Sequence, residues 1–211
     1  MTFFPIPTGI AAVLSIIGTI ILGMPIPYVP AQLLWINLVT NGLQDVALAF
    51  EPGERELVVR PPRDPQEGIM SRLLVQRTLL VALVISAGVV YTFASALDNG
   101  ASLENARTVA VTTMVFFQFF QAGNSRSELK SIFRISPFSN PFLFYSMIAA
   151  FFAQLAFLYV PPFLWVFRTV PLTAPEWLRI VAVLATVIVV VEIDKWIRRK
   201  RLARCVSSPR A

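Results

Sequence analysis

The sequence predicts an all-α fold: a polytopic membrane bundle of about six transmembrane helices in a single domain, residues 1–211. Only 14% of the residues are charged and 56% are hydrophobic, with a mean hydropathy of +0.68. Soluble domains carry about 25% charged residues. The chain also contains six apolar runs of about 20 residues, the length that a helix needs to cross a bilayer. Finally, the basic residues stand in short clusters between these runs, as in membrane proteins of defined topology.

The first two predicted spans cover residues 3–23 and 31–50. The link between them reads MPIPYVP and is rich in proline and uncharged, which favours a tight reversal and therefore a hairpin. A polar, arginine-containing loop, 51–77, follows. The third span covers residues 78–97, a stretch without any charged residue.

The fourth span covers residues 107–125 and the fifth covers 139–160. Prolines before and after the fifth run delimit its helix. The sixth span covers residues 177–196. It has Trp177 at one end and Trp196 at the other, which fits the aromatic belts of a membrane-spanning helix.

The basic residues predict the orientation. All but three of the 18 lie in the loop 51–77, in the loop after the fourth span, or at the end of the sixth span and in the tail 197–211. The exceptions are Arg107, Arg168 and Arg179. By the positive-inside rule, the loop, the tail and both termini are cytoplasmic. We expect an integral multi-pass protein of a bacterial-type plasma membrane, with the lipid bilayer as a partner.

Several classes of site and partner are excluded. The sequence has no histidine, so this chain contains no His-based metal site, triad or proton relay. Cys205 is the single cysteine, so the chain has no disulfide framework of its own. The net charge is +6, but no nucleic-acid recognition motif is present, and we expect no nucleic-acid partner.

The second span contains five polar residues within nine positions. Residues four apart share a face of an α-helix. Asn37, Asn41 and Asp45 therefore form one row, and Thr40 and Gln44 form the next. Polar groups, and above all an acid, are unfavourable in hydrocarbon unless they face a bundle interior or a cavity. The spacing predicts that this stripe faces the interior.

Amide, hydroxyl and carboxylate oxygens in one stripe suit a hard cation or a proton path. The alternative is hydrogen bonding between helices, which commonly joins membrane helices. Five residues on one stripe favour the cation site. For Gln118 in the fourth span, a packing hydrogen bond is at least as good an explanation. Within the stripe, Gly42 permits either close packing or local unwinding, and we expect close packing. The candidate ion-binding residues are Asn37, Thr40, Asn41, Gln44, Asp45 and Gln118. The candidate metal ligands among them are Asn37, Thr40, Asn41 and Asp45.

These residues carry a family resemblance. The stretch PAQLLWINLVTNGLQDVALAFEP resembles the sixth membrane helix of P-type cation-transporting ATPases of the calcium-pump type. PTG at 7–9 and the GMP that follows resemble the end of the fifth helix and the turn after it, and QAGNSRSE at 121–128 resembles the end of the eighth helix. The resemblance covers the chain as helices five to ten. It implies the transmembrane-domain fold of these pumps.

The resemblance also implies site residues. In the family the sixth helix is unwound within the membrane and supplies cation ligands, which by motif position would be Asn37, Thr40 and Asn41. The calcium pumps have an acid at the position of Asn41, a glutamate at that of Ala12 and another acid at that of Gln118. Divalent cations generally require charged oxygen ligands. Calcium transport of the usual kind is therefore not implied, and the transported cation stays open.

The family hydrolyses ATP through an aspartyl phosphate in a DKTG motif, which this sequence lacks. We expect a C-terminal fragment: the membrane-embedded cation-translocation portion of a pump, not catalytic alone and without a cofactor of its own. ATP and Mg²⁺ would bind the phosphorylation, nucleotide and actuator domains, and the N-terminal part of the pump would be the partner. The alternatives are a stand-alone six-span protein with a passive cation-binding or regulatory role, and an inert remnant.

Overall fold

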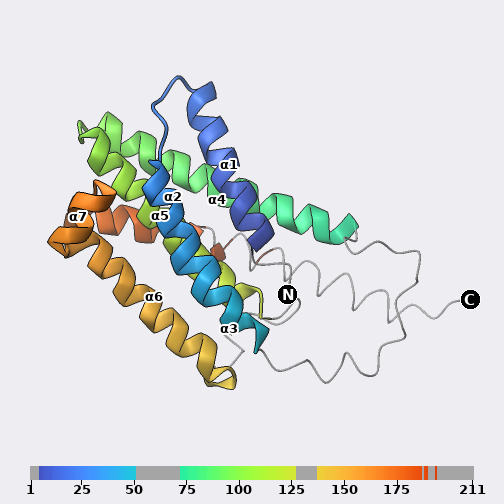
Figure 1. Cartoon of the computed structure of the whole chain (residues 1–211). Helices are drawn as coiled ribbons and strands as arrows, with labels where there is room; N and C mark the ends of the chain where they lie inside the picture. The colour runs from blue at the N-terminus through green and yellow to red at the C-terminus, as the bar shows by residue number, and fades with distance from the viewer. Residues whose placement is uncertain (1–4, 51–71, 127–136, 187, 190–192, 194–211) are drawn as a thin grey trace, which may run out of the picture.

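The computed structural model describes residues 5–50, 72–126, 137–186, 188, 189 and 193. Most of these residues are helical and none is in a strand (Figure 1). The predicted all-α fold is therefore confirmed for the described part of the chain. Residues 51–71 of the predicted loop, the whole tail 197–211 and most of the C-terminal end of the sixth predicted span lie outside it.

Helix α1, Pro5–Ile21, and helix α2, Pro30–Asn37, form the two arms of the predicted hairpin. A proline is well suited to the first turn of a helix, because its missing N–H has no partner there. Gly23 ends α1 with a φ of 68°, and Met24 N donates to Thr19 O at 2.9 Å. A glycine in the left-handed conformation, followed by a residue whose N–H bonds to the carbonyl five residues back, is a common way for a helix to end.

Helix α2 continues without a break into the π-helix η1, Leu38–Asp45, and then into α3, Val46–Ala49. Figure 1 shows them as one continuous ribbon through the middle of the bundle. The predicted span 31–50 is therefore helical throughout, but its central part is wound differently from its ends.

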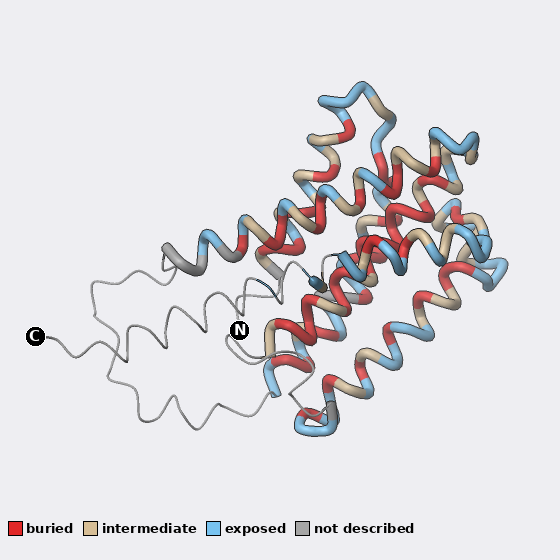
Figure 2. The backbone as a smooth tube through the Cα atoms, turned by 180° about the vertical axis from the view of Figure 1, so that it is seen from behind, coloured by how far each residue is buried: buried red, intermediate tan, exposed pale blue. Residues whose placement is uncertain are grey.

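Helix α4, Arg72–Asp98, and helix α5, Leu103–Asn124, follow as a second hairpin. Ser102 caps α5, since its Oγ accepts a hydrogen bond from Asn105 N at 3.2 Å. Helix α4 packs against both α1 and α5. Helix α5 is buried along nearly its whole length, so it is the central helix of the bundle (Figure 2).

The last third of the described chain contains a 3₁₀ turn η4, Pro137–Ser139, helix α6, Pro141–Tyr159, and the short helix α7, Pro161–Phe167. A further helix begins at residue 174 and is described as far as 186. Asn140 caps α6, since its Oδ1 accepts from Leu143 N at 3.0 Å. Helix α7 has no counterpart among the predicted spans.

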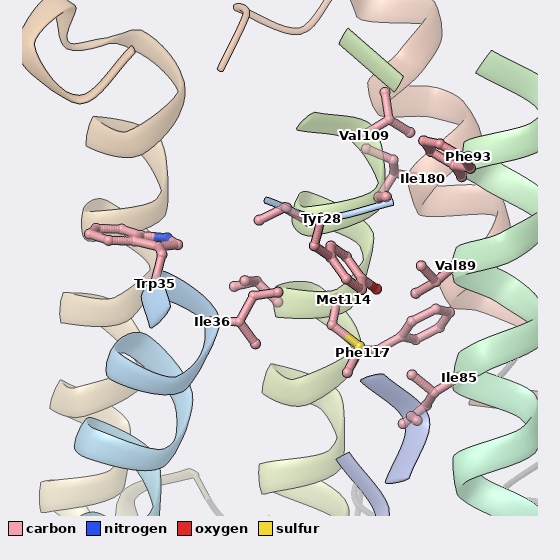
Figure 3. Close-up of a cluster of buried hydrophobic side chains, with 14 of the residues drawn as sticks. Tyr28, Trp35, Ile36, Ile85, Val89, Phe93, Val109, Met114, Phe117 and Ile180 are labelled. Atoms are coloured by element: carbon pink, nitrogen blue, oxygen red, sulfur yellow. The ribbon is translucent and has the colours of Figure 1, made fainter. Parts of the chain in front are cut away.

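The main core joins segments that are far apart in the sequence (Figure 3). Its buried side chains come from α1, the α1–α2 link, α2, η1, α4, α5, α6 and the chain from Leu172 into the helix of residues 174–186. Labelled in the figure are Tyr28, Trp35, Ile36, Ile85, Val89, Phe93, Val109, Met114, Phe117 and Ile180. A smaller cluster joins α3 to the end of α5 and the start of α6. Two helices of the described chain are long and apolar enough to cross a membrane, Thr78–Asp98 and Pro141–Tyr159, and Ile6–Ile21 is a shorter apolar helix.

Candidate cation site

The polar part of the second predicted span is π-helical. η1 contains Thr40, Asn41, Gln44 and Asp45, and Asn37 is the last residue of α2. In a π-helix each N–H bonds to the carbonyl five residues back. Such helices are rare, occur mostly as single-turn insertions and are frequent at functional sites. An eight-residue π segment at the most polar part of an apolar chain is therefore the first indication of a site.

The π register changes which side chains face inward. Ile36 and Val39, three residues apart, are both 2% exposed. In an α-helix the next inward position would be Leu43, four residues after Val39. Leu43 is instead 39% exposed, and Gln44, five residues after Val39, is 0% exposed. The wider winding thus places an amide in the interior where an α-helix would place a leucine.

The Gln44 amide has no hydrogen-bond partner among the residues that the structure describes. Both its Oε1 and its Nε2 are buried and unpaired. Gln118 of α5 is 3% exposed, and its buried Oε1 is likewise unpaired. Helix α5 packs against η1. An unpaired buried polar group costs about 1–3 kcal/mol, and folded proteins contain few of them. Two helices in contact therefore carry amide oxygens whose hydrogen-bonding capacity the described chain leaves unused.

The other candidates are placed differently. Asp45 is half-buried and Asn37 is exposed on the surface of the chain. The side chains of Thr40 and Asn41 lie outside the described part of the structure. The structure thus brings Gln44 and Gln118 into the interior and leaves Asn37 outside it. The α-helical row of residues four apart is interrupted, because the segment between Asn37 and Asp45 is not an α-helix.

Gly42 is not a close-packing glycine within the described chain. A Cβ built on it would meet only Leu38 Cδ1, at 3.9 Å. Its position inside η1 instead matches the second role considered for it, a local departure from α-helical winding.

Helix α6 holds the second span on both sides of η1. Before η1, Trp35 Nε1 donates a hydrogen bond to Gln154 Oε1 at 2.9 Å. After it, Asn140 Nδ2 donates to Ala47 O at 3.1 Å. Sequence reasoning did not single out Asn140 or Gln154. The available signal was the two amides themselves, since Asn140 and Gln154 lie in a largely apolar fifth span.

The Gln154 amide also reaches the central helix. Its Nε2 donates to Thr112 Oγ1 of α5 at 3.3 Å, and Trp35 stacks on Phe157 of α6 with ring centroids 4.9 Å apart. Gln154 therefore joins α6 to α2 and α5, with a hydrogen-bond partner at both Oε1 and Nε2. Gln154 is therefore a structural amide, whereas the polar atoms of Gln44 have no hydrogen-bond partner in the described chain.

Comparison with known proteins places these features in a family. The family model described as "Cation transporting ATPase, C-terminus" matches residues 25–197. The chain is 38% identical over 196 residues to "Probable cation-transporting ATPase F" of Mycobacterium tuberculosis, covering 93% of this chain and 22% of that protein. It is 34% identical over 203 residues to "Calcium-transporting ATPase type 2C member 2" of Mus musculus, covering 94% and 22%. It is 31% identical over 198 residues to "Calcium-transporting ATPase type 2C member 1" of Homo sapiens, again covering 94% and 22%. The chain thus spans about a fifth of the length of these relatives.

Proposed function

Because the chain belongs to the P-type cation-transporting ATPases, as their C-terminal membrane region, we propose that it forms the part of such a pump through which the cation crosses the membrane. A membrane location follows from the family and from the two long apolar helices. The proposal includes six crossings: α1, the α2–η1–α3 segment, α4, α5, α6 and the helix from residue 174. The basic segment 51–77 was predicted as a loop, but its residues 72–77 form the start of α4. This segment, the tail 197–211 and both termini would face the cytoplasm of a bacterial-type cell.

The observation that carries the proposal is the buried, unpaired amide of Gln44 in the π segment. Interior polar groups are normally paired, so an amide held without a partner is suited to a ligand that comes and goes. Amide oxygens bind hard cations. We assign Gln44 and Gln118 as interior ligands of the transported cation, with Asn37, Thr40, Asn41 and Asp45 as the remaining candidates.

The charge of these side chains bears on the cargo. Asp45 is the only acid among the six candidates. Divalent cations are usually held by several carboxylates, so the proposed cargo is a monovalent cation or a proton. ATP and Mg²⁺ would act in parts of the pump outside these 211 residues, whose sequence contains no DKTG motif. The contribution of this chain is then to bind the cation within the membrane.

The test is ATP-dependent uptake of Na⁺, K⁺, H⁺ or Ca²⁺ into vesicles that hold the intact pump containing this chain. Gln44→Met keeps the length of the side chain and removes its polar atoms. We expect the variant to raise the free energy of unfolding by about 1–3 kcal/mol, because an unpaired buried amide is removed. We expect the apparent affinity for the cation to fall about tenfold, because a ligand is lost.

Leu43→Met is the matched control, since it changes the neighbouring, partly exposed side chain of the same π segment. It is expected to leave both transport and stability unchanged. If Gln44→Met transports the cation with the affinity of the parent protein, Gln44 is not a ligand of the cation. Vesicles in which ATP drives no cation movement through the parent protein would overturn the proposed function and favour a passive or structural membrane protein.

A further inference from the structure

A groove lies between α4 and the helix of residues 174–186, and no residue of η1 lines it. Its volume is about 690 Å³, within the range of about 300–1,000 Å³ typical of ligand pockets. The walls are mostly aliphatic and include Leu83 and Ala87 of α4 and Ala182 of the facing helix. The groove is therefore a candidate binding site separate from the polar segment.

The groove is closed on its inner side and open on its outer side. Gly88 forms part of the inner wall, and a Cβ built on it would lie 2.7 Å from Phe117 Cζ of α5 and 3.1 Å from Val183 Cγ1. The three helices thus meet closely behind the groove. On the rim, Leu83 is 58% exposed and Tyr91 is 60% exposed. The opening is on the outside of the bundle that the described residues form, a position from which lipid can enter it.

One end of the groove is charged. Arg179 is the single charged residue among those lining it, and its guanidinium has no hydrogen-bond or ion-pair partner within the described part of the chain. Trp177, two residues earlier, donates from Nε1 to Tyr159 OH at 3.0 Å. Tryptophan and tyrosine gather at the membrane–water interface. Arg179 therefore lies at the level of the lipid headgroups, where an anionic group is available to pair with it.

The dimensions favour a lipid over a protein helix. Leu83 and Tyr91 are eight residues apart on α4, which is about 12 Å along the helix axis. The hydrocarbon core is about 30 Å thick, so the groove extends through most of one leaflet. A partner's transmembrane helix would have to cross both leaflets.

We propose that this groove binds a phospholipid. The phosphodiester pairs with the Arg179 guanidinium, the Tyr91 hydroxyl donates to a phosphate or ester oxygen, and one acyl chain lies along Leu83, Ala87 and Ala182. An arginine fork is well matched to phosphate oxygens. The proposal requires the membrane location of the chain and is independent of the cation function.

The experiment is native mass spectrometry of the intact protein in detergent with added palmitoyl-oleoyl phosphatidylglycerol. The comparison ligand is the diacylglycerol with the same acyl chains, which lacks the phosphate. We expect one phosphatidylglycerol to be retained per chain and the diacylglycerol to be lost. Arg179→Gln should weaken retention about tenfold, the effect of one lost charge-assisted hydrogen bond. Ala87→Phe, which fills the groove, should also displace the lipid.

Arg168→Asn is the matched control. It removes a different arginine, the C-cap residue of α7, which does not line the groove. Arg168 has a φ of 52°, a conformation that asparagine tolerates. This variant should retain lipid like the parent. Equal retention of phosphatidylglycerol by the parent, Arg179→Gln and Ala87→Phe overturns the site. Equal retention of the diacylglycerol overturns the role of Arg179. A cross-link from Ala87→Cys to a membrane-spanning protein in place of lipid overturns the proposed occupant.

Discussion

Gly88 is a residue at which α4, α5 and the helix of residues 174–186 approach closely. A methyl group there would lie 2.8 Å or less from two atoms of the Phe117 ring, and that ring is 1% exposed and surrounded by core side chains. Phe117 therefore has little room to move. We expect Gly88→Ala to lower the free energy of unfolding by about 1–3 kcal/mol, the usual cost of overpacking a core.

The measurement is thermal or denaturant unfolding of the protein in micelles, followed by circular dichroism. Gly9→Ala is the control, because a Cβ on Gly9 of α1 would meet nothing within 4 Å. Replacing a helical glycine by alanine in open space should stabilise by about 0.5–1 kcal/mol. Unfolding of Gly88→Ala at the parental midpoint would show that the three helices are not in this close contact.

Individual residues also show what the sequence predicted and what it did not. The spacing of Gln44 within an apolar span indicated a polar site, and the structure buries that amide. The role of Gln154 depends on Trp35, 119 residues earlier in the chain. No local pattern encodes a partner at that separation, because the pairing is a property of how the helices pack.

Asn140, at the start of α6, makes two hydrogen bonds with different roles, one through its side-chain oxygen and one through its side-chain nitrogen. Oδ1 accepts from Leu143 N at 3.0 Å and caps the helix, while Nδ2 donates to Ala47 O at 3.1 Å and ties α6 to α3. We expect Asn140→Ala to lower the free energy of unfolding by about 1–2 kcal/mol or more, since both contacts are lost.

Asn140→Ser separates the two contacts. The serine hydroxyl can accept from Leu143 N and keep the cap, but it is too short to donate to Ala47 O, which belongs to the smaller core cluster. If the link to α3 matters, Asn140→Ser should lose part of the stability that Asn140→Ala loses, and hydrogen exchange should rise at Val46–Ala49. Exchange in α3 unchanged from the parent would mean that the cap alone is important.

The winding of η1 is an element-scale feature that the sequence did not specify. Helical periodicity assumes 3.6 residues per turn, and on that basis the polar residues form a straight row. The π register shifts the inward positions by one residue between Val39 and Gln44. The close packing expected at Gly42 is wrong within the described chain, and the family resemblance implied an unwound segment without indicating a π-helix.

The whole bundle is organised around α5, and the Gln154 amide joins that helix to two others. Gln154→Met should lower the free energy of unfolding by about 1–3 kcal/mol, because the buried Trp35 Nε1–H and Thr112 hydroxyl lose a partner. This sign is opposite to that expected for Gln44→Met. A double-mutant cycle with Trp35→Phe measures the coupling, and additive effects of the two substitutions would contradict the link.

The whole-molecule prediction succeeded where it rested on composition. Low charge and long apolar runs predicted an all-α chain, and the described residues are helical without strands. Which helix is central was not predicted. Helix α5 carries several threonines and glutamines, yet it is the most buried. Two of its threonines donate to backbone carbonyls one turn earlier in the same helix: Thr108 Oγ1 to Glu104 O and Thr113 Oγ1 to Val109 O, both at 2.8 Å. A polar composition therefore did not imply an exposed face.

The two attachments of the second span to α6 have a mechanical consequence. Asn140 and Gln154 are fourteen residues apart, about 21 Å along α6. Asn140 is hydrogen-bonded to Ala47 and Gln154 to Trp35, and these two partners are twelve residues apart. A π-helix is wider than an α-helix and advances less per residue. If η1 changed to the α form, the segment from Trp35 to Ala47 would become longer, while the distance between its two hydrogen-bond partners on α6 would stay the same. Such a change must then tilt α6 or break one of the two hydrogen bonds. A change in the pitch of the polar segment is therefore transmitted as a displacement of the start of α6.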